Sequence, residues 1–177
     1  MGGESQNIVN ALETRIRQSF SLDKLLCFFT IPVENHLSKK NGRPIFFNKL
    51  RQRHFIGKDA RLKSAEDHMI LEMKMQRISQ NIMDPICERI WTIFHFYFSK
   101  EDYFTKKGDI SLKLPDLSNL YELPQDSLQK AGIILNDTQI ESHDLSRRLY
   151  SDKPRLDIFI LKYDANTYDT RRTNTPC

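Results

Sequence analysis

Hydrophobic positions recur along the chain with two spacings, and the longer spacing predicts two helices. Residues 5–22 carry an apolar stripe at helical intervals, with Ser5 as a candidate N-cap. Residues 59–83 carry a second apolar face, rich in Met, with Asp59 before it and an Asp-Pro pair after it. Both stripes indicate packing against the protein's own core.

The shorter spacing predicts strands. The apolar run LLCFFTIPV, residues 25–33, indicates a buried strand, and RLDIFILKY, residues 155–163, has the composition of a final strand. Residues 86–99 alternate with apolar side chains on both faces, so this strand is expected at the centre of a sheet. Two strand-like pieces, PIFF and RHFI, flank a basic stretch and predict a hairpin.

The last third is expected to mix short helices and strands. A helix starts at Asp116, Pro124 is expected to break it, and a second helical turn ends at Gly132. Residues 133–150 begin a strand region, and SKEDYFTKKGD, residues 99–109, is expected to be a mobile loop.

This element order predicts an α+β fold with a small mixed sheet and flanking helices, because it lacks a regular βαβ alternation. The length of 177 residues suits one domain, expected at residues 25–163. Residues 1–24 would be an N-terminal helical extension, and the polar residues 164–177 a disordered tail.

Positive charge is concentrated in one segment. Residues 39–63 hold nine Lys and Arg against one Asp, so this segment carries +8 and the rest of the chain −4, for a total of +4. Such concentration favours a polyanionic partner, nucleic acid first, although a solvated basic loop is an equal alternative. The candidate DNA-binding residues are Lys39, Lys40, Arg43, Lys49, Arg51 and Arg53.

The three cysteines form no CxxC pair, which argues against a zinc site or a disulfide framework and favours reduced thiols in the cytoplasm. No apolar run approaches the roughly 20 residues that cross a bilayer, so no membrane role is expected.

Two short acidic motifs carry the candidate chemistry. PDLSNL contains Asp116, and NDTQI contains Asp137. Phosphodiester hydrolysis commonly uses carboxylates that bind Mg²⁺, a cation that prefers oxygen ligands. Taken singly, a helix cap is the simpler interpretation of Asp116 and a turn residue that of Asp137.

The stretch PDLSNLYELPQDSLQKAGIILNDTQI resembles the signature of the RusA-type Holliday junction resolvases, in which D-[LI]-D-N-L-x-K precedes an Asp, a Gly-containing apolar stretch and D-D-x-Q-[VI]. FFTIPVENHLSKKNGRPIF is similar to the opening strand and basic loop of that family. The resemblance implies a homodimeric, Mg²⁺-dependent endonuclease that nicks four-way DNA junctions, often of prophage origin. It implies Asp116 and Asp137 as metal ligands and Asp126 as a further catalytic candidate.

Three positions depart from the family pattern. Ser118 stands for the second Asp of the D-x-D pair, Glu122 for a Lys, and Asn136 for the first Asp of D-D. A hydroxyl is a poorer Mg²⁺ ligand than a carboxylate, so one alternative is an impaired protein that still binds junctions. The helix at residues 5–22 and the tail are additions to the family core, so a second alternative is a protein-interaction module without nucleic acid. No phosphate-binding Gly loop, Gly-x-Ser-x-Gly elbow or clustered His points to another enzyme class.

Overall fold

A computed structural model describes residues 24–34, 36, 45–48, 50, 52–56 and 60–163, with the backbone alone for 45–48 and 53–56. The predicted N-terminal helix and C-terminal tail lie outside these residues. The predicted hairpin is confirmed, because β2 (Ile45–Asn48) pairs antiparallel with β3 (Arg53–Ile56) as a separate two-stranded sheet.

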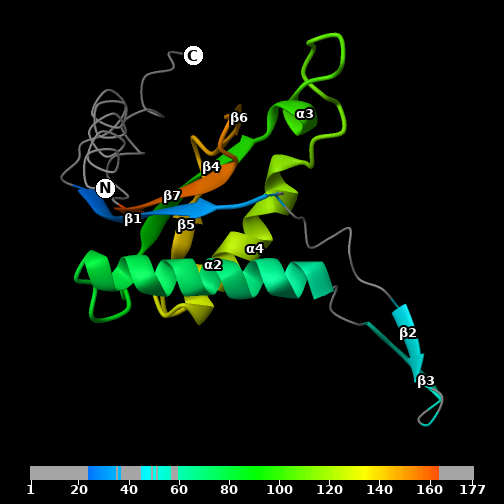
Figure 1. The fold of residues 1–177 in the computed structure, drawn as a ribbon. Coiled ribbons are helices and arrows are strands. Elements are labelled where there is room, and N and C mark those ends of the chain that lie inside the picture. The colour runs from blue at the N-terminus through cyan, green and yellow to red at the C-terminus, as the bar shows by residue number, and fades with distance from the viewer. Residues whose placement is uncertain are drawn as a thin grey trace, which may run out of the picture.

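A mixed sheet forms the centre of the fold, as predicted (Figure 1). Its strands are β1 (Leu25–Pro32), β4 (Ile90–Phe98), β5 (Ile140–Ser142), β6 (Arg147–Tyr150) and β7 (Arg155–Lys162). The order is β1-β7-β4, with antiparallel pairing, and β5 and β6 both pair parallel with β4 on its other side. β5 pairs with the start of β4 and β6 with its end, so the two short strands mark opposite ends of the central strand.

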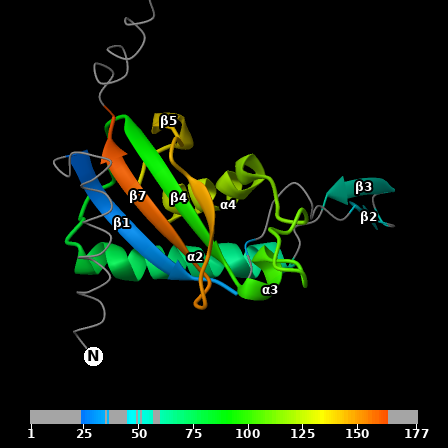
Figure 2. The same ribbon diagram turned by 90° about the horizontal axis from the view of Figure 1, so that it is seen from above.

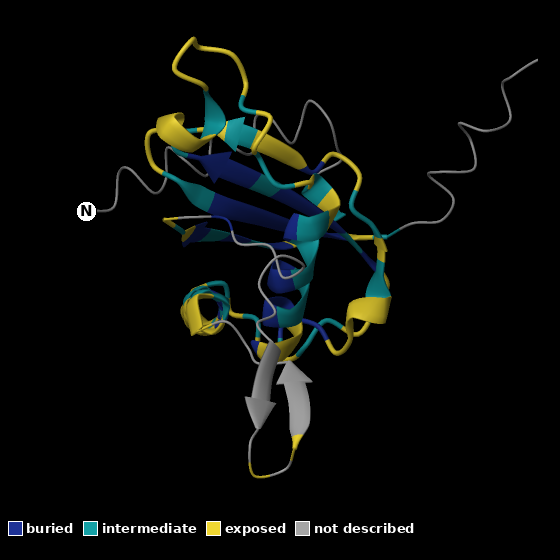
Figure 3. Ribbon diagram, turned by 90° about the vertical axis from the view of Figure 1, so that its right-hand side faces the viewer, coloured by how far each residue is buried: buried dark blue, intermediate teal, exposed yellow. Residues whose placement is uncertain are grey.

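Two helices cover one face of this sheet: α2 (Ala60–Ser79) and α4 (Leu117–Lys130) (Figures 1 and 2). The main core lies between them and the strands, where burial is concentrated (Figure 3). A third helix, α3 (Lys100–Tyr103), begins directly after β4. The α+β prediction with flanking helices is therefore confirmed.

The central position of β4 is confirmed by burial on both of its faces. Ile90, Phe94 and Phe96 contribute to the main core, whereas Ile93 packs with Phe159 on the opposite face. Residues that alternate along a strand point to opposite faces, so an apolar run of this kind needs cover on both sides.

The prediction that Pro124 breaks the helix is wrong, because α4 continues through it. Proline has no N–H, so it cannot donate to the Leu120 carbonyl. Pro124 is itself buried beside Leu120, Leu123 and Leu128, and the packing of this apolar face offsets the missing hydrogen bond. The polar loop predicted at residues 99–109 likewise contains α3, which the Ser99 hydroxyl caps by accepting from the Asp102 N–H.

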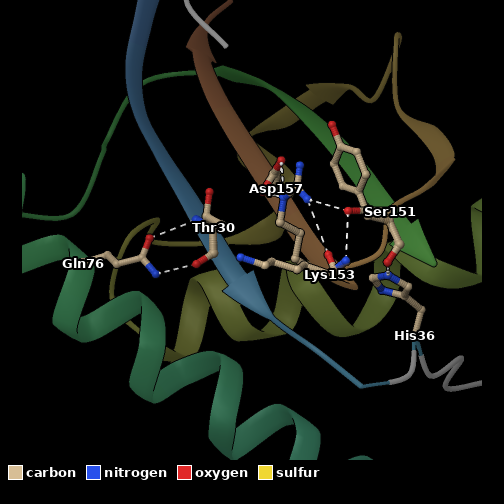
Figure 4. Close-up of polar contacts among 8 residues, drawn as sticks. Thr30, His36, Gln76, Ser151, Lys153 and Asp157 are labelled. Carbon is tan, nitrogen blue, oxygen red and sulfur yellow. Dashed lines mark hydrogen bonds and ion pairs between the residues drawn. The ribbon is translucent and has the colours of Figure 1, made fainter. Parts of the chain in front are cut away.

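The outer edge of β1 is closed by side chains of α2. The amide group of Gln76 accepts from the Thr30 N–H at 2.9 Å and donates to the Thr30 carbonyl at 2.7 Å (Figure 4). Gln80 forms the same pair of bonds with Phe28. Each glutamine satisfies the donor and the acceptor that a neighbouring strand would otherwise pair with, so α2 protects this edge.

Candidate active site

Asp116 occupies the N-cap of α4 with its carboxylate exposed. Its backbone (φ −59°, ψ 139°) is extended, as an N-cap requires, yet its side chain makes no capping hydrogen bond. Only its carbonyl takes part in the helix, accepting from the Asn119 N–H at 3.0 Å. The helix-cap interpretation therefore describes the backbone of Asp116, while the carboxylate stays available to a ligand.

Strand β6 fixes the chain just before Asp116. Arg148 pairs with Phe96 in the parallel ladder between β6 and β4. Its Nη1 donates to the Pro115 carbonyl at 3.0 Å, and its own carbonyl accepts from the Tyr103 hydroxyl at 3.3 Å. The first turn of α4 is thereby tied to the end of the sheet at which β4 runs into α3.

The other acids of the signature lie further along α4. Glu122 and Asp126 are partly buried, and both interact with other groups. Asp126 follows Asp116 by ten residues, a distance of about 15 Å along a helix axis. The structure therefore does not bring Asp126 to Asp116. Ser118, in the position of the missing family Asp, is exposed in the first turn.

Beyond α4, Asp137 is exposed in a single 3₁₀ turn, η3 (Asp137–Gln139). Gly132 (φ 71°) ends α4 with a Schellman pattern, in which the Gly132 and Ile133 N–H groups donate back to the helix. Asn136 then caps the 3₁₀ turn by accepting from the Thr138 N–H at 2.9 Å. Both the cap after α4 and the turn at Asp137 agree with the sequence prediction.

Asp116 and Asp137 lie at opposite ends of α4 (Figure 1). The fourteen residues of the helix alone extend over roughly 20 Å. The sheet gives the same separation. Ile140, close to Asp137, pairs with Ile90, and Arg148, which contacts Pro115, pairs with Phe96. Ile90 and Phe96 are six residues apart, which is roughly 20 Å along β4. One magnesium ion takes ligands at about 2 Å, so a single chain cannot offer both carboxylates to it.

The described residues of one chain accordingly do not fit a complete metal centre. Among the residues described, no group of three or more His, Cys, Asp or Glu side chains could hold a metal ion. Burial also raises the pKa of the Cys27 thiol to about 12, so this thiol is not a reactive nucleophile.

A polar network joins the middle of α4 to the segment between β5 and β6. His143 lies 2.7 Å from the Thr92 hydroxyl and 2.6 Å from the Gln125 amide, and its ring packs on Tyr121 at 4.6 Å. Burial lowers the pKa of His143, which keeps the ring neutral. Ser146 accepts from the Phe94 N–H at 2.9 Å. These bonds set where β6, and therefore Arg148, lies relative to α4.

Basic side chains gather at the Asp116 end. We call residues 100–113 and 147–153 the α3–β6 surface. Its exposed basic residues are Lys100, Lys106, Lys107, Lys113, Arg147, Arg148 and Lys153. Four acids accompany them, namely Glu101, Asp102, Asp109 and Asp152. The candidate residues Lys39, Lys40, Arg43, Lys49 and Arg51 lie outside the described residues, and Arg53 is described only as backbone in β3.

The parallel ladder of β4 with β5 and β6, and α4 between the two acidic motifs, place the signature on one α+β scaffold. The sequence model for the family described as "Endodeoxyribonuclease RusA" matches residues 38–161. This chain belongs to the RusA family. Membership indicates an endonuclease that resolves Holliday junctions and has DNA as its partner. No curated protein matches the chain.

Two further observations concern membrane-spanning helices and the cysteines. Among the described residues, no helix is long and apolar enough to cross a membrane. Of the predicted reduced thiols, Cys27 is buried as expected, whereas Cys87 is exposed and so is not the core thiol that the sequence suggested.

Sequence reasoning missed Arg148 and His143. Arg148 is one of many basic residues, and no local pattern distinguishes it from its neighbour Arg147. Its hydrogen bond to Pro115 spans 33 positions and depends on the parallel pairing of β6 with β4, which the composition of residues 147–150 does not reveal.

Proposed function

We propose that this protein is a Mg²⁺-dependent endonuclease that nicks four-way DNA junctions in recombination and repair. The observation that carries the proposal is the Asp116 carboxylate. It lies exposed at the start of α4, makes no capping bond, and adjoins a surface with an excess of basic groups. Asp116 and Asp137 are the proposed metal ligands.

The separation of these two carboxylates supports a homodimer. Since one chain holds them roughly 20 Å apart, Asp116 of one copy would have to meet Asp137 of the other to share an ion. A two-fold dimer would then contain two equivalent sites, which suits symmetric nicking of a four-way junction.

DNA binding is proposed for the basic segment and the α3–β6 surface. Phosphate contacts supply most of the affinity of such proteins and position the duplex. The candidate residues Lys39, Lys40 and Arg43 follow β1 in the sequence. Strand β1 ends at the same end of the sheet as β4 and the α3–β6 surface, because β7 pairs antiparallel with both strands. Positive charge from the α3–β6 surface adjoins Asp116.

A second candidate function is junction binding without cleavage. The observation that favours it concerns Asn136, which replaces a family Asp. Its Oδ1 accepts from the Thr138 N–H, so it serves as a cap of the turn. Together with Ser118, this leaves one carboxylate at each end of α4 where the family pattern has two.

A nicking assay on a labelled four-way junction separates the two candidates. Purified protein is titrated with Mg²⁺, and binding is measured in parallel in Ca²⁺. Cleavage that is lost in Asp116→Asn supports the nuclease, whereas binding without cleavage at every Mg²⁺ concentration supports the second candidate.

Mixing tests the shared site directly. Asp116→Asn and Asp137→Asn would each be inactive alone. Unfolded and refolded together in equal amounts, they would form heterodimers with one intact site, so about a quarter of all sites would recover. No recovery, with dimers formed, would place both carboxylates on the same chain's site and contradict the arrangement.

A further inference from the structure

We infer that Arg148 is the phosphate-binding cation of the Asp116 site, held there by its hydrogen bond to Pro115. The inference rests on the proposed nuclease function and deepens it by adding a residue that the RusA signature does not contain. Its starting point is the 3.0 Å bond from Arg148 Nη1 to the carbonyl directly before Asp116.

This bond uses a small part of the guanidinium group. The group has five N–H donors in a planar fork, and within the described residues the Pro115 carbonyl is the one acceptor of its hydrogen bonds. Arg148 is exposed, and no described carboxylate lies within ion-pair distance of it. The remaining donors can therefore take an oxyanion without giving up an existing contact.

The orientation of the side chain is fixed from several sides. The backbone of Arg148 belongs to the β4–β6 ladder, and its carbonyl accepts from Tyr103 on α3. The Pro115 bond then sets the guanidinium beside the Asp116 backbone. A cation that is already positioned loses less conformational freedom on binding a phosphate than a lysine on a mobile loop does.

The proposed reaction needs a positive charge close to Asp116, and Arg148 can supply it. A carboxylate that faces a phosphodiester needs positive charge nearby, because the transition state concentrates negative charge on the phosphate oxygens. Glu122 stands where the family pattern has a Lys, so α4 lacks that cation. Arg148 provides one from β6, through a side chain that contacts the carbonyl directly before Asp116.

Substitutions at position 148 test the charge. Arg148→Gln removes the charge and leaves a neutral amide on a shorter side chain, whereas Arg148→Lys keeps the charge. Arg147→Gln is the matched control, since it removes the same charge from the adjacent residue, whose side chain points to the other face of β6. All variants are compared by nicking rate, junction affinity in Ca²⁺ and urea midpoint.

We expect Arg148→Gln to nick about 10- to 100-fold more slowly, the range for loss of a hydrogen bond to a charged group. Its junction affinity in Ca²⁺ should fall further than that of Arg147→Gln, because a phosphate contact is lost, and Arg148→Lys should retain most of the rate. Urea midpoints close to the wild-type value would show that slower nicking does not come from unfolding. If the wild type nicks and Arg148→Gln nicks at the same rate, this inference is overturned but the proposed function stands. A wild-type protein that does not nick would overturn the proposed function and this inference with it.

Discussion

The two ends of α4 carry the two acids of the signature in opposite surroundings. At the start, Asp116 makes no side-chain cap and adjoins the α3–β6 surface, with seven basic residues against four acids. At the far end, Asp137 lies in a turn that Asn136 caps. The basic side chains there are engaged by other groups: Arg89 pairs with Glu141, Lys162 with Glu88 and Lys130 with Glu66. Arg77 donates to the carbonyls of Ile82 and Ala131.

This contrast bears on which end would receive DNA under the proposed function. An anionic backbone approaches the end with surplus positive charge rather than the end whose basic groups are engaged. Under the proposed function, Asp116 would face the phosphate and Asp137 would join a site assembled from two chains. The experiments below test this difference, beginning with the substitution that should have the strongest effect.

Removing the charge at Asp116 should give the largest effect. Asp116→Asn should lower nicking at least 100-fold, since a metal-binding carboxylate supports several kcal/mol of transition-state stabilisation. Its stability should hardly change, because Asn and Asp are equally good N-caps. Nicking rates test the expected loss of activity, and urea unfolding tests the expected unchanged stability. An Asp116→Asn protein that nicks at the wild-type rate would remove the basis for distinguishing the two ends.

Acid should weaken the Asp116 end through His36. The ring donates from Nε2 to the Tyr97 carbonyl (2.9 Å) at the end of β4 (Figure 4). It also packs on Phe96 and Phe98. Burial lowers the pKa of His36 to about 4, below its unfolded value of about 6.5. The unfolded chain then binds more protons in this interval, so stability present above pH 6.5 is lost as the pH falls towards 4.

The expected loss from His36 is about 2 kcal/mol at pH 5, by linkage from these two pKa values. Urea unfolding of the wild type and of His36→Gln at pH 7.5 and pH 5 measures it. The variant should lose less stability on acidification. A smaller loss of stability should remain, because burial also lowers the pKa of His143. Equal losses in both proteins would show that His36 is not responsible.

The sequence was sufficient for the elements that depend on local pattern. The apolar runs of β1 and β7 and the alternation of β4 predicted their strands, because burial imposes these periods directly. The apolar residues of α2 predicted a helix, but only part of that face packs in the core: Met69 and Met73 are buried, whereas Met75 and Ile78 are exposed. Pro124 was misread because local chemistry disfavours proline in a helix, whereas the buried face around it decided the outcome.

The candidate site depends on distances that no local pattern encodes. Asp116 and Asp137 are twenty-one positions apart, and this spacing identified the family. The same spacing hides the fact that a rigid helix lies between them and sets them at opposite ends. Arg148 reaches Pro115 only through a parallel strand pair, so its role follows from topology.

The smallest expected effect is the change in stability when the cap residues Asn136 and Asp116 are replaced. Asn136→Ala removes a side-chain cap and should cost about 1 kcal/mol of unfolding free energy, whereas Asp116→Ala, at an N-cap without a side-chain bond, should cost a few tenths at most. Urea unfolding at pH 7.5 compares them. Equal costs would mean that the Asp116 carboxylate supports the helix after all, and its availability to a metal would lose its structural argument.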